Sequence, residues 1–108
     1  MSHKLPTQVQ SQTLIVTLPH DFSGLAVDHY REQFDELVLL NHSLFVLDFS
    51  QTEFIDSSGI GAMVFLYKRL HKQGKSLELL QVNGQPNKLM KLLRVDRTIG
   101  FIEQLQSA

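Results

Sequence analysis

The run Phe54-Ile55-Asp56-Ser57-Ser58-Gly59-Ile60-Gly61 constrains the fold of this chain more than any other segment. Upstream of it, residues 44–49 (Leu-Phe-Val-Leu-Asp-Phe) form a short apolar and aromatic segment that is typical of a buried strand. Downstream, apolar residues recur at helical spacing from Ile60. A strand that leads into a helix is a building unit of α/β folds, and Ser57 or Ser58 is expected at or beside the N-cap of that helix.

The rest of the chain continues this alternation of strands and helices. Strands are predicted at residues 7–10, 13–18 and 77–82, where β-branched and apolar residues dominate. Helices are predicted after a loop at residues 20–24, from about Ser58 to Gln73, from Pro86, and after Gly100. Gly74 is placed to end the second of these helices, since glycine favours the position after a helix C-cap.

Each predicted helix carries apolar residues that would face a core. In the first helix they are Val27, Tyr30, Phe34, Leu37 and Val38, and in the second they are Ile60, Val64, Tyr67 and Leu70 or His71. In the third they are Leu89, Met90, Leu92 and Leu93, and in the last they are Phe101, Ile102 and Leu105.

These elements predict one small α/β domain over residues 1–108, with residues 1–6 as a flexible N-terminal tail. The two N-terminal strands are expected to pair antiparallel, so the sheet would be mixed. It would have about four strands covered by about four helices. The strand at 44–49 is apolar on both faces, as expected for a central strand covered by helices.

Charge and composition favour protein partners. The formal net charge is -1 and no block of like charge occurs, so the sequence shows no basic footprint for nucleic acid or for an anionic membrane. No run approaches the roughly 20 apolar residues that a membrane span needs, and membrane insertion is not expected. Cysteine is absent, which excludes disulfides and thiolate metal sites and is compatible with a reducing compartment. The cytoplasm is the expected location.

Enzyme motifs do not fit the residues. Neither serine stands in a Gly-x-Ser-x-Gly nucleophile elbow, because Ile55 and Asp56 occupy the positions that need glycine. The segment that starts at Gly59 resembles a dinucleotide fingerprint, but Val64 stands where its third glycine is required. The histidines lie in a tail, in loops or on helices without metal-ligand spacing. No catalytic activity, metal or cofactor is therefore expected.

The chemistry of the Ser57–Ser58 pair has two interpretations. One is structural, because a serine at a helix N-terminus can cap a free backbone N–H group. The other is a phosphorylation switch, because a phosphate at that position meets the positive end of the helix dipole. Asp56 could cap the turn or orient the hydroxyl. Glycines 59 and 61 leave a low surface on which a partner could approach.

Nearly the whole chain resembles the STAS domain of bacterial anti-sigma factor antagonists. The resemblance is carried by residues 46–50 (Val-Leu-Asp-Phe-Ser), 54–61 (Phe-Ile-Asp-Ser-Ser-Gly-Ile-Gly), 67–69 (Tyr-Lys-Arg) and 74–77 (Gly-Lys-Ser-Leu). It implies that Ser57 is phosphorylated by a partner that is both a serine kinase and an anti-sigma factor, and that a serine phosphatase reverses the reaction. The partner-binding residues that it implies are Asp21, Asp56, Ser57, Ser58, Gly59, Ile60 and Gly61.

Asp21 matches the acidic position of the family only with a gap, because the chain has Leu18-Pro19-His20-Asp21 where a Gly-x-Leu-Asp turn is usual. The alternative function is a non-catalytic accessory domain that stabilises a larger assembly, such as the cytoplasmic part of a transporter. In that role Ser57 would only cap the helix.

Overall fold

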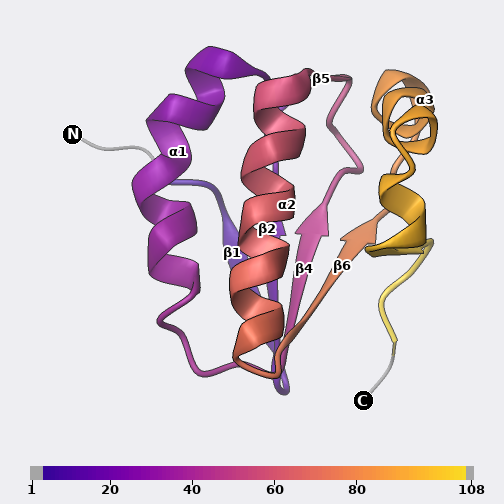
Figure 1. The fold of residues 1–108 in the computed structure, drawn as a ribbon. Coiled ribbons are helices and arrows are strands. Elements are labelled where there is room, and N and C mark those ends of the chain that lie inside the picture. Colours follow the sequence, from indigo (N-terminus) through magenta and orange to yellow (C-terminus); the bar gives the residue numbers. More distant parts are fainter. Residues whose placement is uncertain (1–3, 107–108) are drawn as a thin grey trace.

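The computed structural model describes residues 4–106. Its strands are β1 (Thr7–Gln10), β2 (Thr13–Thr17), β3 (Asp21–Phe22), β4 (Leu44–Asp48), β5 (Phe54–Ile55), β6 (Ser76–Leu80) and β7 (Gly100–Ile102). Its helices are α1 (Gly24–Leu37), α2 (Ser57–Lys72), α3 (Gly84–Leu92) and the short 3₁₀ helix η1 (Val95–Arg97). The predicted α/β fold is confirmed (Figure 1).

The main sheet is mixed and has the order β1-β2-β4-β6-β7. The β1–β2 pair is antiparallel, as predicted, and the other pairs in the sheet are parallel. Strand β4 therefore lies at the centre, with Val46 opposite Ile15 on one side and Glu78 on the other. A separate parallel pair joins the two-residue strands β3 and β5, in a region where the sequence predicted only loops.

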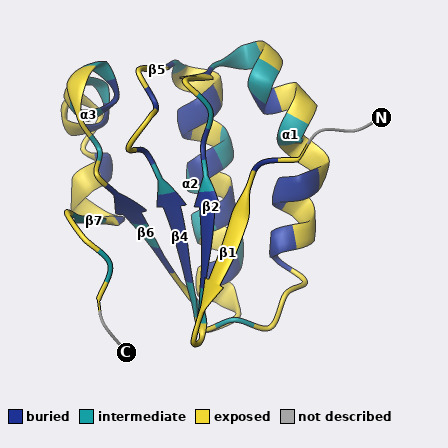
Figure 2. Cartoon of the chain, turned by 180° about the vertical axis from the view of Figure 1, so that it is seen from behind, coloured by how far each residue is buried: buried dark blue, intermediate teal, exposed yellow. Residues whose placement is uncertain are grey.

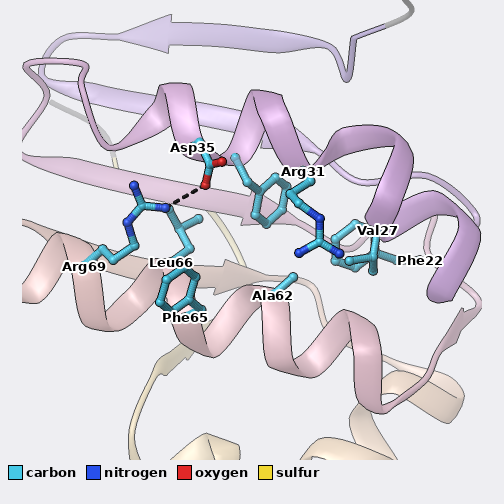
Figure 3. Close-up of a pocket in the computed structure, with 9 residues that line it drawn as sticks. Phe22, Val27, Arg31, Asp35, Ala62, Phe65, Leu66 and Arg69 are labelled. Atoms are coloured by element: carbon cyan, nitrogen blue, oxygen red, sulfur yellow. Dashed lines mark hydrogen bonds and ion pairs between the residues drawn. The ribbon is translucent and has the colours of Figure 1, made fainter.

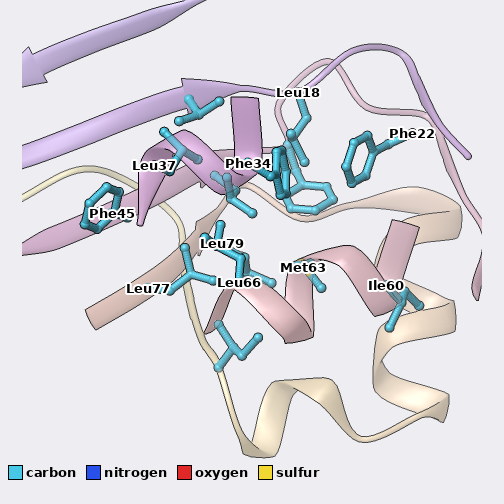
Figure 4. Close-up of a cluster of buried hydrophobic side chains, with 14 of the residues drawn as sticks. Leu18, Phe22, Phe34, Leu37, Phe45, Ile60, Met63, Leu66, Leu77 and Leu79 are labelled. Carbon is cyan, nitrogen blue, oxygen red and sulfur yellow. The ribbon is translucent and has the colours of Figure 1, made fainter. Parts of the chain in front are cut away.

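The main core lies between the sheet and the helices (Figure 4). Phe45 and Leu47 of β4 are fully buried in it, because alternate side chains of a strand point to the same face. The predicted inner face of α1 is confirmed, with Tyr30 only partly buried. In α2 the residues that are buried are Gly59, Ile60, Met63, Leu66 and Leu70, whereas Val64 and Tyr67 are partly buried and His71 is exposed.

Helices cover one face of the sheet. Figure 2 shows the opposite face in front, with α1 and α2 behind it. On that face a second, smaller cluster forms around Ile15, Val46 and Leu80, with Leu105 of the C-terminal segment packed against it. The expectation that helices cover the central strand on both faces is therefore wrong. On the face without helices, Val46 is still fully buried, because side chains of the neighbouring strands and of the C-terminal segment surround it.

The end of the chain differs from the prediction. The segment after Gly100 forms strand β7, which pairs in parallel with β6, instead of a last helix. In α3 the buried residues are Pro86 and Met90, and Leu89 is partly buried. Leu92 and Leu93, which were predicted to face the core, are 76% and 52% exposed.

The N-terminal segment is attached to α1. Leu5 is buried, its N–H donates to Oε1 of the buried Gln33 at 2.8 Å, and its carbonyl accepts from Nε2 at 3.1 Å. The glutamine side chain thus pairs with Leu5 as a neighbouring strand would. The predicted tail at residues 1–6 is wrong for residues 4–6, and residues 1–3, with His3, lie outside the described part of the chain.

Candidate functional site

The candidate site is the junction at which β5 leads into α2. Asp56 is the N-cap of α2, and its Oδ1 accepts a hydrogen bond from the N–H of Gly59 at 3.0 Å. Its Oδ2 accepts from the N–H of Gly24, the first residue of α1, at 3.2 Å. One half-buried carboxylate therefore satisfies N–H groups at the start of two helices, and both helix dipoles stabilise its charge.

Ser57 and Ser58 are the first two residues of α2, and both are exposed. Asp56, and neither serine, provides the side-chain cap. Within residues 4–106, no hydrogen bond involves either serine hydroxyl. Asp56 already takes the N–H of Gly59, so a charged group on Ser57 would meet mainly the positive end of the helix dipole. The cap interpretation of Ser57 is thus wrong, and its hydroxyl is accessible to another protein.

The two glycines of the first turns of α2 have different roles. A Cβ on Gly59 would lie 2.2 Å from the carbonyl oxygen of Phe22 and 2.6 Å from Cγ1 of Ile55. Gly59 therefore allows the close packing of α2 on β3 and β5. A Cβ on Gly61 would meet no atom within 4 Å, and Gly61 is exposed. Gly61 therefore leaves the surface low, as predicted, whereas the same prediction is wrong for Gly59, which is buried.

Strand β5 is held from both sides. Its Phe54 and Ile55 pair with Asp21 and Phe22 of β3. On the other side, the N–H of Ile55 donates to Oε1 of Gln85 at 3.0 Å, and its carbonyl accepts from Nε2 of Gln85 at 2.9 Å. These contacts fix the backbone immediately before Asp56. The sequence gives no local signal for Gln85, because the contact joins residues 30 positions apart.

The other predicted residues of the site lie at the same junction. Asp21 is exposed in β3, next to β5, and its Oδ1 accepts from the hydroxyl of Ser23 at 2.5 Å. Gly59 and Ile60 are buried, so they shape the junction from inside. The surface that another protein could contact is formed by Asp21, Ser57, Ser58 and Gly61.

Sequence reasoning missed the exposed apolar residues near this junction. Leu25 in the first turn of α1 is 89% exposed, and Phe54 in β5 is 45% exposed. Phe65, two turns further along α2, is 60% exposed. The exposure of Phe54 follows from the alternation of a strand, because Ile55 takes the inward position. Helical spacing leaves Leu25 and Phe65 off the predicted inner faces, but it does not show that they lie around this junction.

A groove between α1 and α2 starts at the junction (Figure 3). It has a volume of about 170 Å³, and its walls are formed by Phe22, Val27, Arg31, Phe34, Asp35, Ala62, Phe65, Leu66 and Arg69. Nη1 of Arg69 donates to Oδ1 of Asp35 at 2.7 Å, and its guanidinium lies 5.1 Å from the centre of the Phe65 ring. Phe65 is therefore held in place at the rim of a mostly apolar surface.

An exposed serine thus begins helix α2, directly after the capping Asp56, in a domain built on a mixed five-stranded sheet. The family model of the STAS domain matches residues 4–108. The chain belongs to the STAS domain family. This STAS domain is similar to an anti-sigma-factor antagonist (STAS) domain protein from Planctomyces limnophilus, with a TM-score of 0.88 and 16% identity over 96% of this chain and 93% of that chain.

Two further solved structures share the fold. The Bacillus cell fate determinant SpoIIAA in its phosphorylated form has a TM-score of 0.71 and 17% identity over 93% of this chain and 92% of that chain. A sulfate transporter family protein from Wolinella succinogenes has a TM-score of 0.76 and 17% identity over 91% of this chain and 82% of that chain. At these identities the similarity establishes the fold. In the described part of this STAS domain, every helix is too short or too polar to cross a membrane.

Proposed function

We propose that this STAS domain is an anti-sigma factor antagonist that has no catalytic activity and is controlled by phosphorylation of Ser57. With a bare Ser57 it binds a cognate protein that is both anti-sigma factor and serine kinase. Phosphorylation releases that protein, and a serine phosphatase restores binding. The output is transcription or a related process such as a stress response or biofilm formation. The cytoplasm is the proposed location, because sigma factors act on RNA polymerase there.

The observation that carries the proposal is the exposed, unpaired hydroxyl of Ser57 at the first position of α2. A kinase can reach this hydroxyl without unfolding the helix, because Asp56 and not Ser57 caps it. The bonds that hold β5 on both sides also fix the backbone that leads into Ser57. The exposed apolar side chains of Leu25, Phe54 and Phe65 give a partner protein surface to cover.

Electrostatics explain how a phosphate would release the partner. It adds about -1.5 to -2 charges at pH 7. In the free domain water solvates it, and the dipole of α2 compensates part of the repulsion from Asp56. In a complex the same dianion would lose its water. Burial without paired donors is strongly unfavourable, so the complex weakens much more than the fold.

The test compares three baits: the native chain, Ser57→Asp and Ser57→Ala. Each bait is immobilised on a resin and incubated with a lysate of the cells that make the protein. The captured proteins are then identified by mass spectrometry. The expected result is one protein with a kinase fold that binds the native and Ala baits and is lost from the Asp bait. Ser58→Asp is the matched control for added charge, and it distinguishes the two serines. Equal capture by all baits would contradict the proposal.

The second candidate is an accessory domain of a transporter assembly. The observation that favours it is the similar fold of the sulfate transporter family protein. An accessory domain has no need for a switchable serine, so its assembly should tolerate Ser57→Asp. Copurification of membrane transport proteins with both the native chain and the Asp variant would favour this candidate over the switch.

A further inference from the structure

A second surface, away from the proposed switch, lies at the end of α3 and on η1. We define the α3-end patch as Lys88, Lys91, Leu92, Leu93, Arg94 and Arg97, all of which are exposed. Figure 1 shows α3 at the edge of the domain opposite to α1. We propose that the α3-end patch binds the surface of an anionic lipid membrane, with its two leucines in the interface and its four cations near the lipid headgroups.

The charges of the patch favour an anionic occupant. Residues 88–97 contain four cationic side chains and one acidic side chain, Asp96, in a chain whose formal net charge is -1. Within residues 4–106, none of the four cations forms an ion pair. Lys68, Lys72 and Lys75 are likewise without one, so the patch is distinguished by the clustering of its charges in ten residues. The overall charge of the chain conceals this local excess, which is why composition predicted no basic footprint.

The leucines favour a lipid surface over a purely polar polyanion. Leu92 and Leu93 are adjacent and are 76% and 52% exposed, and cations flank them on both sides in the sequence. Lys88, Lys91 and Leu92 share one face of α3 by helical spacing. Protruding apolar side chains between basic residues are typical of proteins that lie on a membrane without crossing it.

The fold holds the patch rigidly. Pro86 and Met90 bury the inner face of α3, and Val95 anchors η1 in the main core. Between these anchors Arg94 has φ +63°, a left-handed conformation in which glycine is the favoured residue. A basic side chain therefore occupies a position that glycine would fill with less strain. This makes Arg94→Gly a useful variant, because it should keep or raise thermal stability while removing one cation.

The test uses the full chain and vesicles of defined composition. Sedimentation is measured with phosphatidylcholine vesicles that contain phosphatidylglycerol and with phosphatidylcholine vesicles alone, at low and physiological salt. The native chain should bind the anionic vesicles and lose binding as salt rises. Each cation near the surface contributes about fivefold to the partition coefficient, so Arg94→Gly should reduce it about fivefold and the pair Lys88→Glu, Lys91→Glu by more than tenfold.

Matched variants separate the patch from general properties of the chain. Leu92→Ser with Leu93→Ser should reduce binding to anionic vesicles several-fold, whereas Leu25→Ser with Leu39→Ser, at positions that are 89% and 82% exposed, should not. Lys68→Glu with Lys72→Glu on α2 controls for net charge. Equal binding to neutral and anionic vesicles, or equal loss in the control variants, would overturn the proposal. Loss on charge reversal with no effect of the leucine variants would overturn the lipid occupant and indicate an acidic macromolecule.

Discussion

At the scale of single residues, the carboxylate of Asp56 is the centre of the site. It accepts hydrogen bonds from Gly59 of α2 and Gly24 of α1, whereas the hydroxyl of Ser57 caps neither helix. We expect Asp56→Ala to lower the free energy of unfolding by about 1 to 3 kcal/mol, because two charge-assisted bonds are lost. Ser57→Ala should change it by less than about 0.5 kcal/mol. Urea denaturation measures both, and equal losses in the two variants would contradict this assignment.

The two glycines give a second prediction at this scale. Gly59→Ala should lower the free energy of unfolding by about 2 kcal/mol or more, because its Cβ would overlap the carbonyl oxygen of Phe22. Gly61→Ala is the matched control. Gly61→Ala should raise the free energy of unfolding by about 0.5 to 1 kcal/mol, since alanine favours helices and no atom lies within 4 Å of the added Cβ. Thermal denaturation measures both variants. Similar changes in stability for Gly59→Ala and Gly61→Ala would contradict the close packing of α2 on β3.

At the scale of elements, two glutamine side chains each form a pair of hydrogen bonds with the backbone of a residue distant in the sequence. Gln85 pairs with Ile55, and Gln33 pairs with Leu5. We expect Gln85→Ala to accelerate hydrogen exchange of the Ile55 amide selectively, because that amide loses its acceptor. Gln33→Ala should do the same for Leu5 and leave Ile55 unchanged. Exchange at Ile55 that does not respond to Gln85→Ala would show that β3 alone holds β5.

Element by element, the success of the sequence prediction follows from the length of each periodic segment. Helices α1 and α2, with 14 and 16 residues, were predicted because several turns repeat the same pattern. Strand β7 has 3 residues, and the spacing of Phe101, Ile102 and Leu105 also fits a helical turn. Its pairing with β6 decides its structure. The two-residue strands β3 and β5 are equally invisible without their tertiary contact.

The candidate site was predictable only in part for the same reason. Ser57 and its neighbours form one continuous motif that can be recognised in the sequence. Gln85 and Gly24 reach the junction from segments 30 and 32 residues away. The role of Asp56 as a cap for two helices needed the position of α1. The same contact places the exposed Leu25 beside the junction, which the sequence pattern could not show.

At the scale of the whole molecule, the switch is predicted to act through binding and to leave the fold intact. The main core extends over the sheet, α1, α2 and α3, and Ser57 is exposed outside it. Ser57→Asp should therefore unfold in a single transition at a denaturant midpoint close to that of the native chain. Circular dichroism during guanidinium denaturation measures this. A large drop in the midpoint would indicate that phosphorylation acts by unfolding α2.

The measurement that tests the central claim most directly is phosphosite mapping of the protein isolated from its own cells under several growth conditions. The native chain should yield a phosphopeptide with the phosphate on Ser57, and the fraction should change with condition. In a Ser57→Ala strain this signal should disappear and no phosphate should move to Ser58. An unmodified Ser57 under every condition, or a phosphate on Ser58 alone, would contradict a switch at Ser57.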